Sequence, residues 1–168
     1  QPPPPPPPPP GTTITLNPTD DAYVRSDDAN GNFGSSSTLR VKQSSPTYRS
    51  YLKFAVSGAS GTVQSAKLRM RVTEGSGSGG SVFLVSNTYR SSSTQWDEGG
   101  LTYNNAPTLS GNALSTVGGV SAGAWVEFDV TAAITGNGTF SLGLQSTSSS
   151  TVRYSSSEGN DDPQLVVQ

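Results

Sequence analysis

The feature that most restricts the fold is a strict alternation of apolar and polar side chains in short runs. In residues 66–72 every second side chain is apolar, and the three between them are positively charged, at Lys67, Arg69 and Arg71. Residues 51–56 and 125–130 show similar alternation. Because successive side chains of a strand point to opposite faces, each run predicts a strand with one buried face and one wet face.

Further short runs of this kind are separated by turn residues. The predicted strands cover residues 13–16, 22–25, 38–41, 51–56, 66–72, 82–85, 125–130, 139–144, 151–154 and 164–167. The helical candidate is a single turn within residues 129–134. This organisation predicts an all-β fold, an antiparallel two-sheet β-sandwich of the jelly-roll type.

The composition excludes several classes of chemistry. The 168 residues include no cysteine and no histidine, so thiol chemistry, a Ser-His-Asp triad and histidine-ligated metals are ruled out. A formal net charge of −2 argues against a nucleic-acid partner, and no stretch is suited to membrane insertion. Asp97 and Glu98 are chain neighbours, whereas a glycosidase needs two carboxylates that face one sugar. We therefore expect no enzymatic activity.

An arm, residues 1–11, precedes the predicted domain of residues 12–168. Its consecutive prolines are Pro2, Pro3, Pro4, Pro5, Pro6, Pro7, Pro8, Pro9 and Pro10. Proline fixes φ and lacks an N–H, so the run predicts a stiff polyproline II helix. Two roles are open: a linker that holds the domain away from a neighbour, and a preformed docking element for assembly.

The chain starts at Gln1 and not at methionine. Two explanations are open, removal of a signal peptide and a chain cut from a longer protein. We favour the first, because a Gln-Pro start before a linker suits a mature secreted chain. The predicted location is therefore extracellular or at the cell surface.

Several motifs, taken in order, are similar to those of one family. They are Arg49-Ser50-Tyr51-Leu52-Lys53-Phe54, Ser65-Ala66-Lys67-Leu68-Arg69, Trp96-Asp97-Glu98, Leu101-Thr102-Tyr103-Asn104-Asn105-Ala106-Pro107, Trp125-Val126-Glu127-Phe128-Asp129-Val130-Thr131, Ser157-Glu158 and Pro163-Gln164-Leu165-Val166-Val167. The chain thus resembles the DNRLRE domain family of bacterial extracellular proteins over residues 13–167. The resemblance implies a jelly-roll sandwich and, as in some members, recognition of alginate-like acidic polysaccharides. The family often carries an arginine where this chain has Ser157.

A stripe of cations is the candidate polysaccharide-binding surface. It consists of Lys67, Arg69 and Arg71 on one strand face, with Arg49 and Lys53 expected nearby, and it could pair with sugar carboxylates. The alternative is cross-strand pairing of these cations with Glu127 and Asp129.

Aromatic side chains could add stacking faces for sugar rings. The candidates are Trp125, Trp96, Tyr23, Tyr89 and Tyr103. For Trp96 we expect a structural role, packing one end of the sandwich.

Oxygen-bearing side chains are concentrated at Asp27, Asp28, Asn30 and Asn32. Calcium prefers carboxylate, amide and carbonyl oxygens, so these four are candidate ligands of a structural calcium ion. The alternative is that they are turn residues without a metal.

Two functions from different classes remain open at this point. The favoured one is a structural subunit of an extracellular fibre or surface assembly, a homopolymer whose polyproline arm docks on the next subunit. The alternative is a carbohydrate-binding module for an acidic polysaccharide, with the prolines as an interdomain linker. Neither function requires catalysis.

Overall fold

The computed structural model describes residues 1–4, 13–59 and 61–168. Prolines 2–4 are exposed and lie in no regular secondary structure, whereas prolines 5–10 are outside the described residues. The polyproline II arm and its two alternative roles therefore stay predictions.

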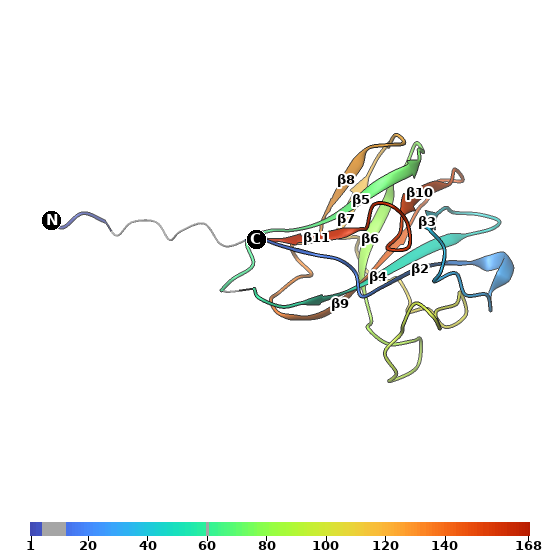
Figure 1. Cartoon of the computed structure of the whole chain (residues 1–168), viewed down its shortest axis with the longest axis horizontal. Coiled ribbons are helices and arrows are strands. Elements are labelled where there is room, and N and C mark those ends of the chain that lie inside the picture. Colours follow the sequence, from blue (N-terminus) through green and yellow to red (C-terminus); the bar gives the residue numbers. More distant parts are fainter. Residues whose placement is uncertain (5–12, 60) are drawn as a thin grey trace.

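Two antiparallel sheets form a β-sandwich (Figure 1). One sheet has the strand order β1-β11-β5-β10-β3, with β8 also paired to β5, and the other has the order β2-β4-β9-β6-β7. The strands are β1 (Ile14–Leu16), β2 (Asp20–Arg25), β3 (Thr38–Val41), β4 (Tyr48–Val56), β5 (Ala66–Glu74), β6 (Gly80–Val85), β7 (Ser115–Val117), β8 (Trp125–Asp129), β9 (Gly138–Gln145), β10 (Val152–Ser155) and β11 (Gln164–Val167). This arrangement confirms the predicted all-β antiparallel sandwich.

Strand β5 follows the alternation that the sequence shows. Its apolar side chains from Ala66 to Val72 are buried, and the charged residues between them are partly exposed. The strand pairs with β8 on one side and with β11 and then β10 on the other. This pairing engages the main chain of β5 on both edges, and packing against the other sheet covers its apolar face.

The main core lies between the two sheets. It joins Phe54 and Leu142 of one sheet to Leu68, Phe128 and Tyr154 of the other, all inaccessible to solvent. Burial of one such side chain stabilises the fold by about 1.5–3 kcal/mol. The Tyr154 hydroxyl donates to the carbonyl oxygen of Gly79 at 2.7 Å, so its polar end is also satisfied.

A second core covers the outer face of the β2-β4-β9-β6-β7 sheet. Residues 86–114, the covering loop, connect β6 to β7 and pack Trp96, Leu101 and Ala106 against Tyr51. The rings of Tyr51 and Trp96 meet edge to face, with centroids 6.3 Å apart. The expectation of a wet face is therefore wrong for Tyr51 and Lys53, which are buried, and holds for Ala55, which is exposed. A long connection can bury a sheet face that local alternation marks as exposed.

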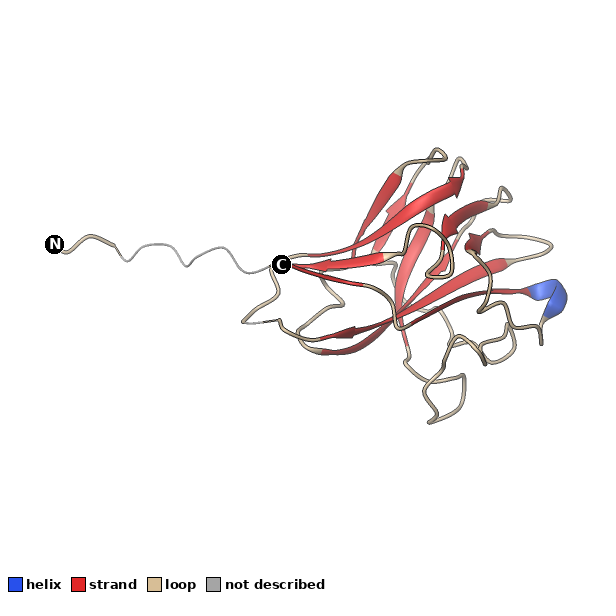
Figure 2. Ribbon diagram, in the orientation of Figure 1, coloured by secondary structure: helices blue, strands red, loops and turns tan. Residues whose placement is uncertain are grey.

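Other differences from the prediction are small. Among the described residues the helical structure is confined to one 3₁₀ turn, η1 (Ser26–Asp28) (Figure 2). Residues 129–134 form no helix, although Ala133 N–H donates to the Val130 carbonyl at 3.0 Å and closes a turn. In the part of the chain that the structure covers, no helix has the length and apolar character needed to cross a membrane. Strand β7 was not predicted.

Candidate functional site

The predicted basic stripe lies on the outer face of β5 beside β8. Lys67 is in register with Asp129 and Arg69 with Glu127, and the charged atoms of these pairs are 3.2 and 3.5 Å apart. The Arg69 guanidinium also lies 5.0 Å from the centroid of the Trp125 ring. The alternative prediction of cross-strand pairing is confirmed, so much of the stripe's charge is neutralised by its own neighbours.

Arg71, the third cation of the stripe, is less closely engaged. Its Nε lies 4.0 Å from an Asp161 carboxylate oxygen, and its guanidinium is 6.0 Å from the Trp125 ring centroid. Binding of polysaccharide at Lys67, Arg69, Arg71 and Trp125 stays a prediction.

The prediction that Arg49 and Lys53 lie beside this stripe is wrong. Both residues belong to β4, whereas the stripe lies on β5, and these two strands belong to opposite sheets. The Arg49 guanidinium lies 5.4 Å from the Tyr103 ring centroid in the covering loop. The sequence could not show this separation, since strand pairing across the chain is a tertiary property.

Lys53 is 5% exposed and its ammonium is enclosed by the covering loop. The ammonium donates to the carbonyl oxygens of Asn87, at 3.2 Å, and Trp96, and to Oε1 of Gln95 at 3.3 Å. Burial lowers the pKa of Lys53, and the charges of Asp20 and Asp97 oppose that shift. This geometry makes Lys53 a clamp between sheet and loop. Trp96 is 1% exposed, which confirms a structural role, but it packs on the outer face of the sheet and not at an end of the sandwich.

A group of cations over aromatic rings forms where β2, β3 and β4 come together. We call it the cation–aromatic cluster; its members are Arg25, Arg40, Lys42, Tyr23, Phe33 and Tyr48. Tyr48 lies centrally, with Arg25, Arg40 and Lys42 placed 5.3, 5.8 and 5.2 Å from its ring centroid. The Arg40 guanidinium is also 4.9 Å from the Tyr23 ring centroid.

The rings of the cluster serve as a platform for the cations. Tyr23 stacks on Phe33 at 4.8 Å and meets Tyr48 edge to face at 6.0 Å. Tyr23 and Tyr48 are 3% and 8% exposed, so their faces hold the cations and are not open to a sugar ring. Cation–π contact contributes about 0.5–2 kcal/mol and restrains the side chain above the ring. The positive charges are thereby fixed in place.

Two cations of the cluster have no acidic partner within the described residues. Arg25 pairs with Asp27 at 2.6 Å, whereas Arg40 and Lys42 form no ion pair there, and Arg40 Nε has no hydrogen-bond acceptor. Sequence reasoning missed this cluster apart from Tyr23. Cations at positions 40 and 42 alternate as those of 67–71 do, and that signal was available.

The residues predicted as calcium ligands have protein partners. Asp27 binds Arg25, and Asn30 Oδ1 accepts from Asn104 Nδ2 at 2.7 Å. Asn32 Nδ2 donates to the carbonyl oxygens of Glu98 and Leu101, at 2.7 and 2.9 Å. Asp28 lies in the 3₁₀ turn η1. Calcium at Asp27, Asp28, Asn30 and Asn32 stays a prediction.

Three carboxylates from distant segments converge elsewhere, at Asp21, Glu98 and Glu158, with one oxygen of each within 4.8 Å of the others. Ser157 donates its N–H and its hydroxyl to the Asp21 carboxylate at 2.8 and 2.5 Å. Burial raises the pKa of Asp21 to about 7, opposed by these hydrogen bonds. The pKa of Glu98 is also raised, and burial is the largest cause. Such oxygens have the chemistry of ligands for a hard divalent cation.

The fold and its surface define the class of protein: an antiparallel β-sandwich that presents fixed cations and hydroxyl groups and has no histidine or cysteine for catalysis. Residues 12–168 match the sequence model of carbohydrate-binding module family 96, and the chain belongs to that family. No curated protein sequence matches the chain.

Family membership decides between the two predicted functions at the level of class. It supports a carbohydrate-binding module, and a module of this kind is not catalytic by itself, in agreement with the expected lack of enzymatic activity. It does not support a homopolymeric fibre subunit that docks through its arm. The resemblance to carbohydrate-binding modules is confirmed, and the DNRLRE name itself stays a prediction.

Proposed function

We propose that the domain binds an acidic, alginate-like polysaccharide through the cation–aromatic cluster. The observation that carries this proposal is the pair Arg40 and Lys42, two cations fixed over buried rings with no acidic partner in the described ranges. An acidic polysaccharide carries a carboxylate on successive sugars, and Arg can hold a carboxylate through two parallel hydrogen bonds.

Electrostatics favour this cluster over the stripe on β5. A cation that already has a partner must exchange it for a ligand carboxylate, so the net gain is small. Arg40 and Lys42 have no ion pair among the described residues to give up, and the rings beneath them reduce the side-chain entropy lost on binding. The surrounding protein is acidic overall, with a net charge of −2, so attraction for a polyanion depends on local groups of cations such as this one.

The first prediction removes those two charges. The Arg40→Ala/Lys42→Ala double variant should bind polyguluronate and polymannuronate oligosaccharides about 10- to 100-fold more weakly than the parent, because one charge-assisted hydrogen bond contributes about 1.5–3 kcal/mol. Calorimetric titration at low and high NaCl measures the effect. The parent's affinity should fall as salt rises, since mobile ions screen exposed charges.

The matched control is Lys67→Ala/Arg69→Ala, which changes the net charge by the same amount on the other surface. We expect its affinity to stay close to that of the parent. Loss of binding in this control with retention in the Arg40/Lys42 variant would move the site to the stripe. A parent that binds none of these oligosaccharides would refute the proposed ligand class.

We also propose that the module acts outside the cell, with residues 1–11 as a linker to a neighbouring domain. The support is the ligand class, since acidic polysaccharides of this kind belong to extracellular matrices and walls, together with the stiffness expected of consecutive prolines. Immunodetection of the native protein in the culture medium and in cell fractions tests the location directly; recovery from the cell interior alone would contradict it.

A further inference from the structure

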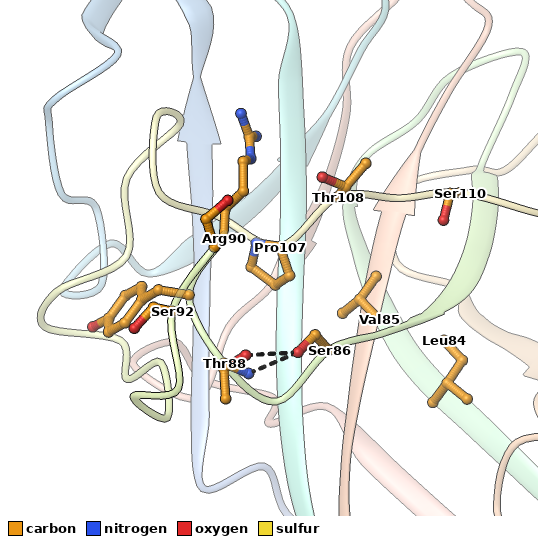
Figure 3. A pocket seen from close by; sticks show the side chains of 11 residues that line it. Leu84, Val85, Ser86, Thr88, Arg90, Ser92, Pro107, Thr108 and Ser110 are labelled. Atoms are coloured by element: carbon orange, nitrogen blue, oxygen red, sulfur yellow. Dashed lines mark hydrogen bonds between the residues drawn. The ribbon is translucent and has the colours of Figure 1, made fainter.

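A pocket of about 460 Å³ lies between the end of β6 and the covering loop (Figure 3). Its walls come from three segments: residues 84–86, residues 88–92 and residues 107–110. The volume falls in the range of small-ligand sites. None of the members of the cation–aromatic cluster lines it, so it is a separate place on the domain.

Hydroxyl groups dominate the polar part of this lining. They belong to Ser86, Thr88, Ser91, Ser92, Thr108 and Ser110. Ser86 and Thr88 already hydrogen-bond to each other at 2.8 Å (Figure 3). A hydroxyl both donates and accepts, as the hydroxyls of a sugar do.

Arg90 is the one ionised side chain among the lining residues that the structure describes. Its Nε donates to the Ala106 carbonyl at 3.1 Å, and its guanidinium points away from Ser86 and Leu84 (Figure 3). The rest of the lining carries no ionised group, so most of the polar contacts in the pocket come from hydroxyl groups.

The apolar members of the lining offer little surface to a sugar ring. Leu84 is 48% exposed, but its side chain points to the face of β6 opposite to that of Val85 (Figure 3). Pro107 is buried, and its carbonyl accepts from the Tyr51 hydroxyl at 3.1 Å. Recognition at the pocket therefore depends on hydrogen bonds more than on apolar contact.

Strand β6 adds main-chain groups at the same place. Strand β7 pairs with Gly80–Val82 of β6 and no further, and Leu114 N–H donates to the Val82 carbonyl at 2.8 Å. Main-chain groups of residues two apart in a strand point to the same edge of that strand. The N–H and C=O of Leu84 therefore point to the same edge as those of Val82, beyond the end of β7, where no described strand pairs with them. A free carbonyl accepts from a sugar hydroxyl and repels a carboxylate.

The walls are held in position before any ligand arrives. Trp96 Nε1 donates to the Ser141 hydroxyl at 3.1 Å, and that hydroxyl donates to Asn87 Oδ1 at 2.7 Å. The Lys53 ammonium bonds to the Asn87 and Trp96 carbonyls in the same network. Binding to such a fixed site loses little conformational entropy.

We propose that this pocket is a second binding site of the module, which takes an uncharged sugar residue through hydrogen bonds to the hydroxyl groups of the lining and to the main-chain groups of Leu84. The inference rests on the proposed function in that it assumes a glycan-binding module, but it assigns a different site and a different ligand class. The module would then read an acidic stretch at the cation–aromatic cluster and a neutral sugar at the pocket.

The test is an NMR titration of the full chain with uncharged hexasaccharides of glucose, mannose, galactose and N-acetylglucosamine, at concentrations into the millimolar range. At least one should shift the amide resonances of Leu84, Thr88 and Thr108. Thr108→Trp, which fills the pocket from an exposed position, should weaken that binding about tenfold or more.

Thr135→Trp is the matched control, because Thr135 is also exposed but lies outside the pocket lining. It should bind like the parent, and the Arg40→Ala/Lys42→Ala variant should keep its neutral-sugar binding. Absence of shifts at the pocket with every hexasaccharide overturns the inference. So does a pocket that responds only to uronate oligosaccharides. If Thr108→Trp still binds uronate oligosaccharides like the parent, the proposed function stands, whether or not the pocket binds a neutral sugar.

Discussion

Replacing Lys53 by methionine should destabilise the domain by about 2–4 kcal/mol, because the carbonyls of Asn87 and Trp96 lose their donor in a buried place. For a domain of this size each kcal/mol lowers Tm by about 2–4 °C. Urea denaturation followed by tryptophan fluorescence measures the loss, since Trp96 lies in the covering loop. The effect should be large for a position that the sequence marks as a surface cation.

The control is Lys67→Met, the same substitution in an exposed ion pair with Asp129. It should change the free energy of unfolding by no more than about 1 kcal/mol. If the two variants unfold at the same urea concentration, Lys53 does not clamp the covering loop to β4.

Stability should fall as pH rises from about 5 to 8, because Asp21 binds its proton more tightly in the folded state. The unfolded carboxyl has a pKa of 3.8 and burial raises the folded pKa to about 7, so between these values the folded state holds more protons. The free energy of unfolding then decreases by about 1.4 kcal/mol per pH unit up to about pH 7 and little above it, which amounts to about 3 kcal/mol between pH 5 and 8.

Asp21→Asn tests this assignment, since the amide keeps a similar shape and cannot ionise. Its Oδ1 can accept from Ser157 N–H while its Nδ2 donates toward the Ser157 hydroxyl or Glu98, both of which surround Asp21. The variant should show a flatter pH profile and exceed the parent in stability at pH 8. Urea titrations from pH 5 to 8 in EDTA, which keeps cations off the three carboxylates, measure both. An equally steep profile in the variant would place the proton elsewhere.

The fold was largely predictable because it depends on local alternation. The strand containing Leu68, Met70 and Val72 has the same inward face in the sequence pattern and in the sandwich. Prediction failed where a distant segment covered a face. Lys53 looks exposed by alternation, yet the covering loop encloses its ammonium.

The candidate site was less predictable, because its members come from segments that are neighbours only after folding. Arg40 and Tyr48 flank the β3–β4 connection, whereas Tyr23 comes from β2. The bridge between Lys42 and Tyr48 joins β3 to β4 and brings these side chains together. A cation without an acidic partner can be recognised only once its spatial neighbours are known.

By itself the sequence determined that this chain forms strands of alternating polarity and contains neither histidine nor cysteine, because periodicity and composition are local properties. The tertiary structure decided which charges meet. It paired Lys67 with Asp129, left Arg40 without an acid in the described residues, and buried Asp21 beside Glu98. Strand alternation tells which side chains share a face, but only the packing of strands and of the covering loop decides whether that face meets water, protein or ligand.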